Sequence, residues 1–300
     1  MTDRTPVRAA THRRPDLDAA AGVWLWRSYV APILYGDDVA VEVEFVPAGQ
    51  SPAGDDVEAV IDTGGVCDPA GGRFDHHTAD LGADRAVSAT ALVYRRALEL
   101  GAPVDHLEPL IALVTEGDHG GAAWSRQVGL HAMLQALLAA EADDEAVVDA
   151  VGRWLDLVDH TLAAQARARA EVDSAIVWRA PDGAVAAILD GSPDVTRAAF
   201  ELHDELRLVV WLNRQSTTVS VGCRRREGLP WAVGDVLDGV ADRLAADAEL
   251  AGEIARWFRH GSGVFAMRGT AKNPDPTPLG EAAFLRLAQV LWEGLRRVTG

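Results

Sequence analysis

The sequence predicts an α/β protein with a parallel-sheet N-terminal domain, a helical linker and a smaller α/β C-terminal domain. Apolar runs of strand length alternate with helical segments up to about residue 120. A long stretch rich in Ala and Leu follows, and short β-type runs begin at Ala175. We therefore expect domains at residues 1–125 and 173–300, joined by a linker at residues 126–172.

The N-terminal elements are placed by their apolar runs and by capping residues. Ser88 is suited to begin a helix because its hydroxyl can accept a backbone N–H, and Gly101 is suited to end it. Strands alternating with helices form a parallel sheet whose ligands bind at the carboxyl ends of the strands. The expected strands are Val7–Ala10, Val39–Val46 and Val57–Ile61, and the expected helices are Ala19–Leu34, Ala89–Leu100 and His106–Thr115.

The second half of the chain is expected to contain two linker helices within residues 129–169, the second beginning at Asp144, followed by strands and then helices. The expected strands are Ala175–Trp178, Ala184–Leu189, Leu206–Leu212 and Thr217–Cys223. The expected helices are Val233–Asp247, Leu250–Arg259 and Leu279–Val298.

Composition limits the class of protein. The chain has 300 residues, of which 48% are hydrophobic and 24% charged, as is ordinary for a globular protein. No uncharged stretch is long enough to cross a bilayer, and the N-terminus lacks the apolar segment of a signal peptide. Cys67 and Cys223 are far apart and form no metal-type spacing. We expect a cytoplasmic protein with no membrane partner.

The net charge of −17 bears on the substrate. Proteins that bind long nucleic acids usually present a basic face, because phosphate neutralisation drives their affinity. This chain is acidic, and Lys272 is its single lysine. The charge favours a small anionic substrate held by a few arginines over a long polymer. Alternatively, the acidity serves only solubility.

A first group of potential metal ligands follows an expected strand. Asp62 comes directly after the apolar run that ends at Ile61, and a loop rich in Gly and Pro leads from it to Asp75-His76-His77. Carboxylate and imidazole groups together suit a divalent ion such as Mn²⁺. Adjacent histidines in a loop are more often only exposed polar residues, so this group alone is weak support for a metal site.

A second group strengthens the interpretation. His12, Asp16 and Asp18 lie within seven positions, after the first expected strand and before a helix. The carboxyl ends of parallel strands meet at one edge of a sheet, so the two groups are expected to lie together.

In this order the two groups resemble the first three motifs of the DHH phosphoesterase superfamily. The motifs are His-x-x-x-Asp-x-Asp at residues 12–18, the Asp62 that closes a strand, and Asp-His-His at residues 75–77. The run from Asp62 through Asp68-Pro69 to His77 is most similar to that of MYG1-type exonucleases. The superfamily also has a fourth motif, an Asp in a later turn, which Asp118 resembles. Glu116 could take that role instead, or both acids only occupy a glycine-rich turn.

The resemblance implies a set of ligands for two divalent ions that hold a bridging hydroxide. Mn²⁺ is the expected ion, and Mg²⁺ or Co²⁺ is possible. The resemblance also implies that Asp62 bridges the ions, that His12 and Asp16 complete one site, and that Asp18, His76 and Asp118 complete the other. His77 would then contact the phosphate or protonate the leaving oxygen, and Asp75 would orient a histidine. Arg13, Arg14 and Arg73 are candidate substrate contacts or plain surface charges.

The C-terminal domain offers a second set of candidates. Arg224-Arg225-Arg226 closes an expected strand, where cations could clamp phosphate oxygens. The turn His260-Gly261-Ser262-Gly263 lets backbone N–H groups approach an anion. By resemblance, His260, Ser262, Gly263, Phe265 and Lys272 correspond to a MYG1-type substrate turn, whereas the Gly-Gly-Gly-His turn common in nanoRNases and recombination exonucleases is absent. Alternatively, the turn is an ordinary connection between a helix and a strand, and the three consecutive arginines are only exposed to solvent.

Together these features favour a Mn²⁺-dependent phosphodiesterase, similar to MYG1-type 3′–5′ exonucleases, that acts on short oligonucleotides and could form a homodimer. A pyrophosphatase or exopolyphosphatase is the enzymatic alternative, although it would need more basic residues in the second domain. A phospholigand-binding protein without turnover is the other alternative. The complete set of ligand types in the first three motifs argues against it.

Overall fold

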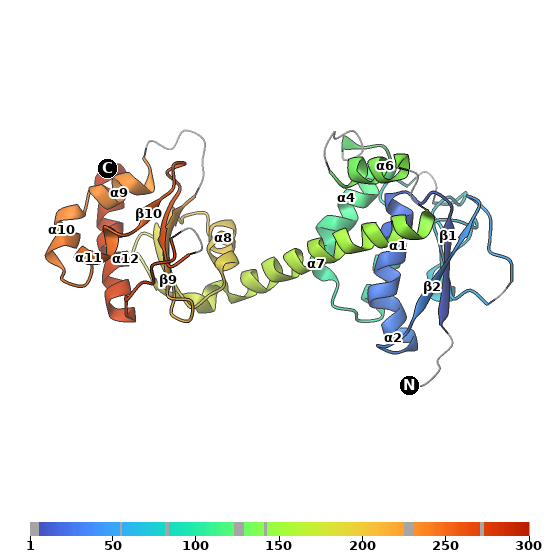
Figure 1. Cartoon of the computed structure of the whole chain (residues 1–300), viewed down its shortest axis with the longest axis horizontal. Coiled ribbons are helices and arrows are strands. Elements are labelled where there is room, and N and C mark those ends of the chain that lie inside the picture. The colour runs from blue at the N-terminus through green and yellow to red at the C-terminus, as the bar shows by residue number, and fades with distance from the viewer. Residues whose placement is uncertain are drawn as a thin grey trace. The chain divides into compact units, whose positions relative to one another are not determined.

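A computed structural model describes residues 6–54, 56–81, 84–122, 129–140, 143–224, 231–270 and 273–299. The chain forms two units, residues 1–163 and residues 164–300. The boundary lies within the long helix α7 (Asp144–Ala175), which is visible in Figure 1.

The sheet of the first unit has the strand order β2-β1-β3-β5-β4. Its central strands are parallel, and only β4 runs antiparallel to its neighbour β5. The predicted parallel α/β fold is therefore confirmed. The two-residue strands β4 and β5 were not predicted, because two residues are too few to show the alternation of apolar and polar side chains that is typical of a strand. The strands are β1 (Val7–His12), β2 (Val41–Val46), β3 (Ala59–Ile61), β4 (Cys67–Asp68) and β5 (Arg73–Phe74).

The helices of the first unit begin with a continuous helical segment from Leu17 to Tyr35, where the sequence predicted a helix over residues 19–34. Gly22 in this segment lets α1 approach the sheet, since a Cβ atom there would lie 2.7 Å from Cγ2 of Ile61. Ser88 caps α3 as expected, its Oγ accepting the Ala91 N–H at 3.2 Å. The elements are α1 (Leu17–Leu25), the π-helical η1 (Trp26–Val30), α2 (Ala31–Tyr35), α3 (Ala89–Glu99), α4 (Glu108–Asp118) and α6 (Leu130–Ala139), with short 3₁₀ turns η2 (Pro69–Gly71) and η3 (Asp105–Leu107).

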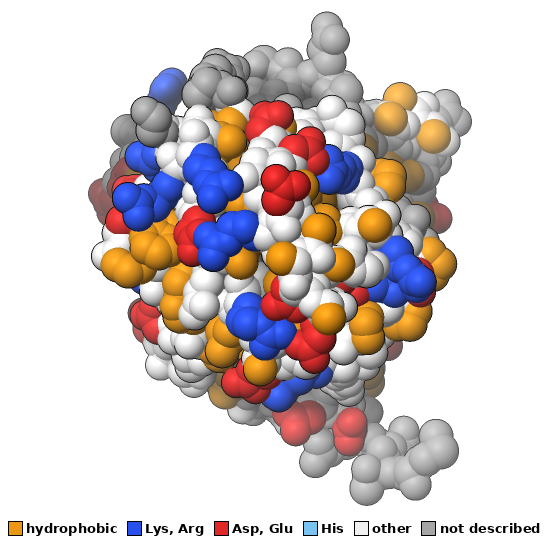
Figure 2. Space-filling view, turned by 90° about the vertical axis from the view of Figure 1, so that its left-hand side faces the viewer, with side chains coloured by type: hydrophobic (Ala, Val, Ile, Leu, Met, Phe, Trp, Pro, Cys, Tyr) orange, Lys and Arg blue, Asp and Glu red, His pale blue; other side chains and the backbone are white. Residues whose placement is uncertain are grey.

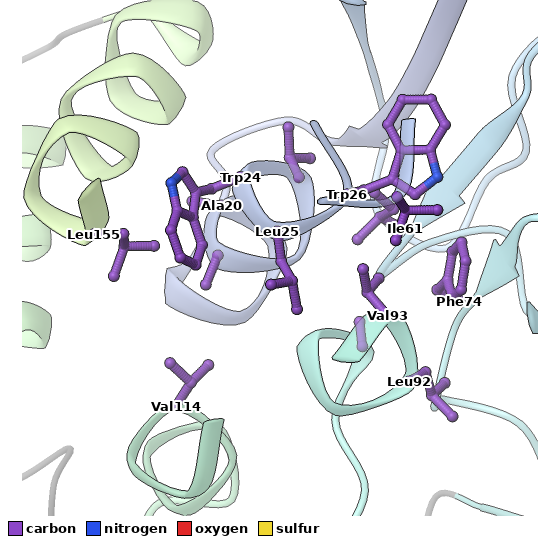
Figure 3. Packing of buried hydrophobic residues seen from close by; sticks show 14 of the residues in the cluster. Ala20, Trp24, Leu25, Trp26, Ile61, Phe74, Leu92, Val93, Val114 and Leu155 are labelled. Atoms are coloured by element: carbon purple, nitrogen blue, oxygen red, sulfur yellow. The ribbon is translucent and has the colours of Figure 1, made fainter. Parts of the chain in front are cut away.

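The core of the first unit surrounds α1. Figure 3 shows Trp24 and Leu25 directed into it, with Ile61 on the sheet side and Val114 and Leu155 on the side of α4 and α7. All five side chains are buried. Burial of an apolar side chain of this size stabilises the fold by roughly 1.5–3 kcal/mol. The packing fixes α1 against the strands and so holds the loops at their carboxyl ends.

Residues of the expected linker belong to this core. Val147, Val151 and Leu155 on α7 are buried in it. The Trp24 indole donates a hydrogen bond of 2.8 Å to Asp156, and the Tyr29 hydroxyl donates one of 2.7 Å to Asp159. The first part of α7 is therefore a structural element of the first unit.

The second unit contains a mixed sheet in the order β10-β11-β9-β8-β7-β6, in which only β7 and β8 pair in parallel. The strands are β6 (Ile176–Arg179), β7 (Val185–Leu189), β8 (Leu208–Asn213), β9 (Thr218–Cys223), β10 (Phe258–Arg259) and β11 (Phe265–Arg268). The helices are α8 (Pro193–Leu202), α9 (Val233–Asp238), α10 (Ala241–Ala246), α11 (Ala251–Ile254) and α12 (Glu281–Thr299).

Two predictions in this unit were wrong. The helix expected over Leu250–Arg259 ends early, and Phe258 and Arg259 form β10 because they pair with β11 in a hairpin. Cross-strand pairing of this kind overrides local helix propensity. The helix expected over Val233–Asp247 is divided at Gly239 into α9 and α10.

The surface of the second unit carries charges of both signs. On the face seen in Figure 2, basic and acidic side chains lie interspersed among hydrophobic ones and form no continuous basic stripe among the described residues. No helix in the described part of the chain has the length and apolar character needed to cross a membrane.

Candidate metal centre

The candidate ligands of the first unit come together at one edge of its sheet. His12 ends β1, Asp62 follows β3 and His76 lies just after β5, while Asp118 ends α4. Because β1, β3 and β5 are adjacent parallel strands, their carboxyl ends deliver these side chains to one place. The structure thus brings together residues more than a hundred positions apart in the sequence.

Asp62 is the residue shared by two ligand clusters. Its side-chain Oδ2 lies 3.3 Å from Nε2 of His12, and its Oδ1 lies 3.5 Å from Nε2 of His76. The residue is only 4% exposed. The two oxygens of one carboxylate therefore face two different imidazoles.

The backbone at Asp62 is in the left-handed region, with φ at +55°. This conformation is uncommon for a residue with a Cβ atom and costs of order 1–3 kcal/mol. The Asp62 N–H donates to the Phe74 carbonyl at 3.1 Å, which holds the residue beside β5. In this conformation the carboxylate of Asp62 lies between His12 and His76.

The first cluster contains His12, Asp16 and Asp62, whose ligand atoms lie within 4.8 Å of one another. Nδ1 of His12 is 2.9 Å from the Arg13 carbonyl, which only accepts hydrogen bonds, so Nδ1 carries the proton. Nε2 of His12 is then the nitrogen available to a metal ion. Asp16 caps α1, its Oδ1 accepting the Ala19 N–H at 3.0 Å.

The second cluster surrounds Nε2 of His76. This atom lies 3.5 Å from Asp62 Oδ1, 3.5 Å from Asp118 Oδ2 and 3.8 Å from Asp18 Oδ2. Both ring nitrogens of His76 and Oδ1 of Asp62 are buried without a hydrogen-bond partner in the described part of the chain. Such orphaned buried groups are rare and costly. A divalent cation bound between His76 Nε2 and Asp62 Oδ1 would satisfy those two atoms, so the residues fit a metal.

Asp18 has a structural contact in addition to its place near His76. Its Oδ2 accepts the Ala89 N–H at 2.7 Å and its Oδ1 accepts the Thr90 N–H at 2.9 Å. These donors belong to the first turn of α3, where a negative charge is stabilised. The carboxylate therefore fixes α3, and any ligand role uses its remaining lone pairs.

Asp75 positions a loop and a histidine. Its Oδ2 accepts the Gly65 N–H at 2.6 Å. Its Oδ1 lies 2.9 Å from the His77 backbone N and 3.0 Å from His77 Nδ1. The His77 side chain is 63% exposed, and its Nδ1 lies 3.5 Å from Asp62 Oδ1. Asp75 thus holds an accessible imidazole that forms a group of potential ligands with Asp62 and His76.

The electrostatics of the site favour a bound cation. Burial by itself would lower the pKa of His12 and of His76, but the carboxylate of Asp62 and its acidic neighbours raise each pKa to about 9. Burial, together with the charges of Asp62 and Asp118, raises the pKa of Asp18 to about 8. Burial opposes ionisation of Asp62, but His12 and His76 hold its pKa below the usual range. In the absence of metal, protons compensate the crowded carboxylates.

Arg73 and Glu116 lie near the clusters without joining them, whereas His119 forms a further group of potential ligands with His76 and Asp118. The Arg73 guanidinium donates to the carbonyls of Gly71 and Gly72 at 3.2 and 3.3 Å. Glu116 is exposed and is not part of a ligand cluster among the described residues. His119, for which the sequence predicted no definite role, has Nε2 2.9 Å from the Val87 carbonyl and 3.9 Å from Asp118 Oδ2. Its position next to Asp118 was the only signal for it in the sequence.

The remaining arginines of the metal motifs contact backbone or side chains outside the clusters. Arg13 Nε lies 3.5 Å from the Phe45 carbonyl. The backbone N–H of Arg14 donates to Asp144 on α7 at 2.8 Å.

In the second unit, Arg224 follows β9 and contacts the end of α8. Its guanidinium donates to the carbonyls of Phe200 and His203 and to Asp204, the latter two at 2.7 and 2.9 Å. These contacts satisfy free carbonyls at a helix C-terminus. Arg225, Arg226 and Lys272 lie outside the described residues.

The segment His260-Gly261-Ser262-Gly263 forms the turn between β10 and β11. Nδ1 of His260 lies 2.7 Å from Ser262 Oγ, and the His260 ring stacks on Phe265 at 4.4 Å between centroids. Gly263 takes φ +71°, which the turn requires. Phe265 pairs with Gly222, so the turn lies on the strand next to the one that Arg224 follows.

Comparison with known proteins adds structural neighbours only. No protein-family model matches the chain, and no curated protein matches it. Similar solved structures include exonuclease RecJ bound to manganese, a pGpG-specific phosphodiesterase from Vibrio cholerae, and an uncharacterized protein from Helicobacter pylori G27. In the same order, their sequence identities to this chain are 16%, 11% and 12%, and their TM-scores are 0.34, 0.29 and 0.33. The matches cover 96%, 96% and 98% of this chain and 90%, 98% and 99% of the other chains.

Proposed function

We propose that the chain is a divalent-metal-dependent phosphodiesterase of the DHH superfamily, with a MYG1-like preference for short oligonucleotides and for Mn²⁺. The observation that carries the proposal is the division of the Asp62 carboxylate between two ligand clusters, Oδ2 towards His12 and Oδ1 towards His76. A carboxylate with this placement is suited to bridge two cations.

The ligand atoms divide into two sets around this bridge. His12, Asp16 and Asp62 would hold one ion, and His76, Asp118, Asp18 and the other oxygen of Asp62 would hold the second. Two such ions lower the pKa of water and neutralise charge that develops on a phosphate. The mixture of carboxylate and imidazole ligands suits Mn²⁺ and is also compatible with Mg²⁺ or Co²⁺.

His77 is the residue that we assign to proton transfer. Its exposed side chain can meet a substrate, whereas the buried His76 cannot. Since Asp75 Oδ1 accepts the proton of Nδ1, Nε2 of His77 remains to contact a phosphate oxygen or to protonate the leaving oxygen. Asp75 acts through His77 by fixing its ring.

The proposed substrate is small because the chain carries a net charge of −17. A protein with such a negative net charge does not attract a polyanion over long distances. Binding of the substrate must therefore come from local contacts. We assign phosphate contacts in the second unit to Arg224, to the turn His260-Gly261-Ser262-Gly263 and to Lys272. The exposed turn and its stacked imidazole support this assignment.

The test is a substrate panel with purified protein and Mn²⁺. Labelled dinucleotides and short RNA and DNA oligomers are compared with cyclic dinucleotides, pyrophosphate and polyphosphate. We expect release of mononucleotides from the short oligomers. Faster turnover of pyrophosphate or polyphosphate would replace the proposal by the inorganic-phosphate alternative. Tight Mn²⁺ binding without hydrolysis of any panel member would indicate a phospholigand-binding protein.

A further inference from the structure

A cavity of about 510 Å³ lies between α3 and α4 of the first unit. Ala91, Tyr94 and Arg95 line it from α3, and Ile111 and Ala112 line it from α4. Its volume is within the range of small-molecule sites. None of these residues belongs to the metal motifs.

The cavity adjoins the metal centre through His119, which lines the cavity and forms a group of potential ligands with His76 and Asp118. His119 lines the cavity and also lies beside Asp118, with 3.9 Å between Nε2 and Oδ2. Its ring meets the ring of His76 edge-on, with 5.8 Å between centroids. The Val87 carbonyl accepts a hydrogen bond from His119 Nε2 at 2.9 Å and holds the ring in this position. A group bound in the cavity would therefore adjoin a phosphate held at the metal centre.

The lining combines an apolar surface with a few polar groups. Ala91 and Ile111 are buried and apolar, and the Tyr94 ring is half-buried. Arg85 and Arg95 are exposed at the cavity, and neither forms an ion pair with another described residue. Glu108 and Glu116 also line it and offer hydrogen-bond acceptors. Aromatic and guanidinium groups next to apolar walls suit a flat ring with a polar edge.

We propose that the α3–α4 cavity binds the nucleobase of the nucleotide adjoining the scissile phosphate. The inference rests on the proposed phosphodiesterase function and extends it, because it names the part of the substrate that the first unit recognises. Tyr94 and the Arg95 guanidinium provide the stacking surfaces, and Ile111 and Ala91 form the apolar floor. His119 separates the base from the phosphate.

The first experiment fills the cavity from its exposed wall. Ala112 is exposed on α4, so Ala112→Trp occupies the cavity without disturbing the buried core. Leu98→Trp is the matched control, since Leu98 is exposed on α3 and does not line the cavity. Each variant is assayed on a dinucleotide and on the same dinucleotide with one base removed, and its thermal unfolding is compared with that of the parent protein.

We expect Ala112→Trp to lower kcat/KM for the intact dinucleotide by about 10–100-fold, the effect of losing one stacked base. The abasic dinucleotide should change by less than about twofold in the same variant, and Leu98→Trp should alter neither substrate. Equal losses on both substrates, or none on either, would overturn the base-binding role.

A second pair of variants tests the guanidinium contact. Arg95 lines the cavity, whereas its neighbour Arg96 lies outside it and pairs with Glu99 at 3.1 Å. Arg95→Gln should lower kcat/KM for the intact dinucleotide only, and Arg96→Gln should have no effect. The same loss in both variants would indicate a general effect of charge and contradict the proposal.

A binding measurement separates this inference from the phosphodiesterase proposal. Adenosine 5′-monophosphate is titrated into the Mn²⁺-loaded protein by calorimetry, with ribose 5-phosphate as the baseless probe. If the parent protein binds the nucleotide more tightly than ribose 5-phosphate and Ala112→Trp abolishes this preference, the base-binding role of the cavity is supported. This holds even if no substrate of the panel is hydrolysed. Hydrolysis of dinucleotides together with equal binding of both probes would refute the cavity and leave the activity intact.

Discussion

Nε2 of His76 lies 3.5 Å from Oδ1 of Asp62, and neither atom has a hydrogen-bond partner among the described residues. Both are buried, so the pair is costly unless a third group satisfies it. The pair is the strongest structural indication that a cation belongs here, and it leads to the first prediction.

Asp62→Asn should remove bound metal and activity together. An amide has one neutral oxygen and cannot bridge two cations, so we expect kcat/KM to fall by more than about 100-fold with a loss of Mn²⁺ measured by elemental analysis. Asp37→Asn, a change at an exposed position, is the control. Two tightly bound ions and normal turnover in Asp62→Asn would disprove the bridging role.

The stability of the metal-free protein should fall as pH rises. The pKa of His12 and of His76 is raised from 6.5 to about 9, so their stabilising charge is fully present below pH 6.5 and is lost as pH rises through 9. The raised pKa of Asp18, about 8, acts in the same direction. Since Mn²⁺ must displace these protons, its stabilisation should grow over the same window.

This pH dependence is measured as the Tm of EDTA-treated protein with and without added Mn²⁺. The increase in Tm caused by Mn²⁺ should become larger between about pH 6.5 and pH 9. A shift in Tm that stays constant with pH would place the binding site away from His12 and His76.

His77→Ala should separate catalysis from metal binding. Because the exposed His77 is assigned to the substrate, Mn²⁺ occupancy should survive while kcat falls by about 10²–10⁴. His160→Ala changes an exposed histidine on α7 and should leave both quantities unchanged. Loss of metal from His77→Ala would show instead that His77 is a ligand.

Asp18→Asn should destabilise the first unit even without metal. An asparagine can accept only one of the two hydrogen bonds that Asp18 accepts from Ala89 and Thr90. An unsatisfied buried N–H costs about 1–3 kcal/mol, which urea unfolding in EDTA would detect. Asp84→Asn is the matched control, because Asp84 accepts the Ala86 N–H at an exposed turn. Unchanged stability would mean that Asp18 does not fix α3.

His260→Ala should weaken binding of oligonucleotides more than that of a small ester. If the turn holds a remote phosphate, kcat/KM for an oligonucleotide should fall by about 10–100-fold, while bis-p-nitrophenyl phosphate changes by less than about threefold. Arg224→Ala is informative in a different way, since Arg224 also contacts the end of α8. A lower Tm with equal losses on both esters would assign Arg224 to the fold alone.

The sequence by itself determined three of the five strands in the sheet of the first unit and which residue types lie at its edge. The apolar runs that contain β1, β2 and β3 are local signals, and Ser88 is a local helix cap. His12 and Asp62 lie at the ends of apolar runs that were predicted as strands of a parallel sheet, because strands and helices alternate along the N-terminal half of the chain. Their convergence could therefore be predicted without coordinates.

Only the tertiary structure decided how those side chains are oriented and what else surrounds them. The left-handed backbone of Asp62, the contact of Asp18 with the start of α3 and the cavity behind His119 depend on packing between distant segments. The pairing of β10 with β11 and the contact of Arg224 with α8 are likewise long-range. Local propensity and period describe a segment and its near neighbours, whereas these features arise from pairings that no local pattern encodes.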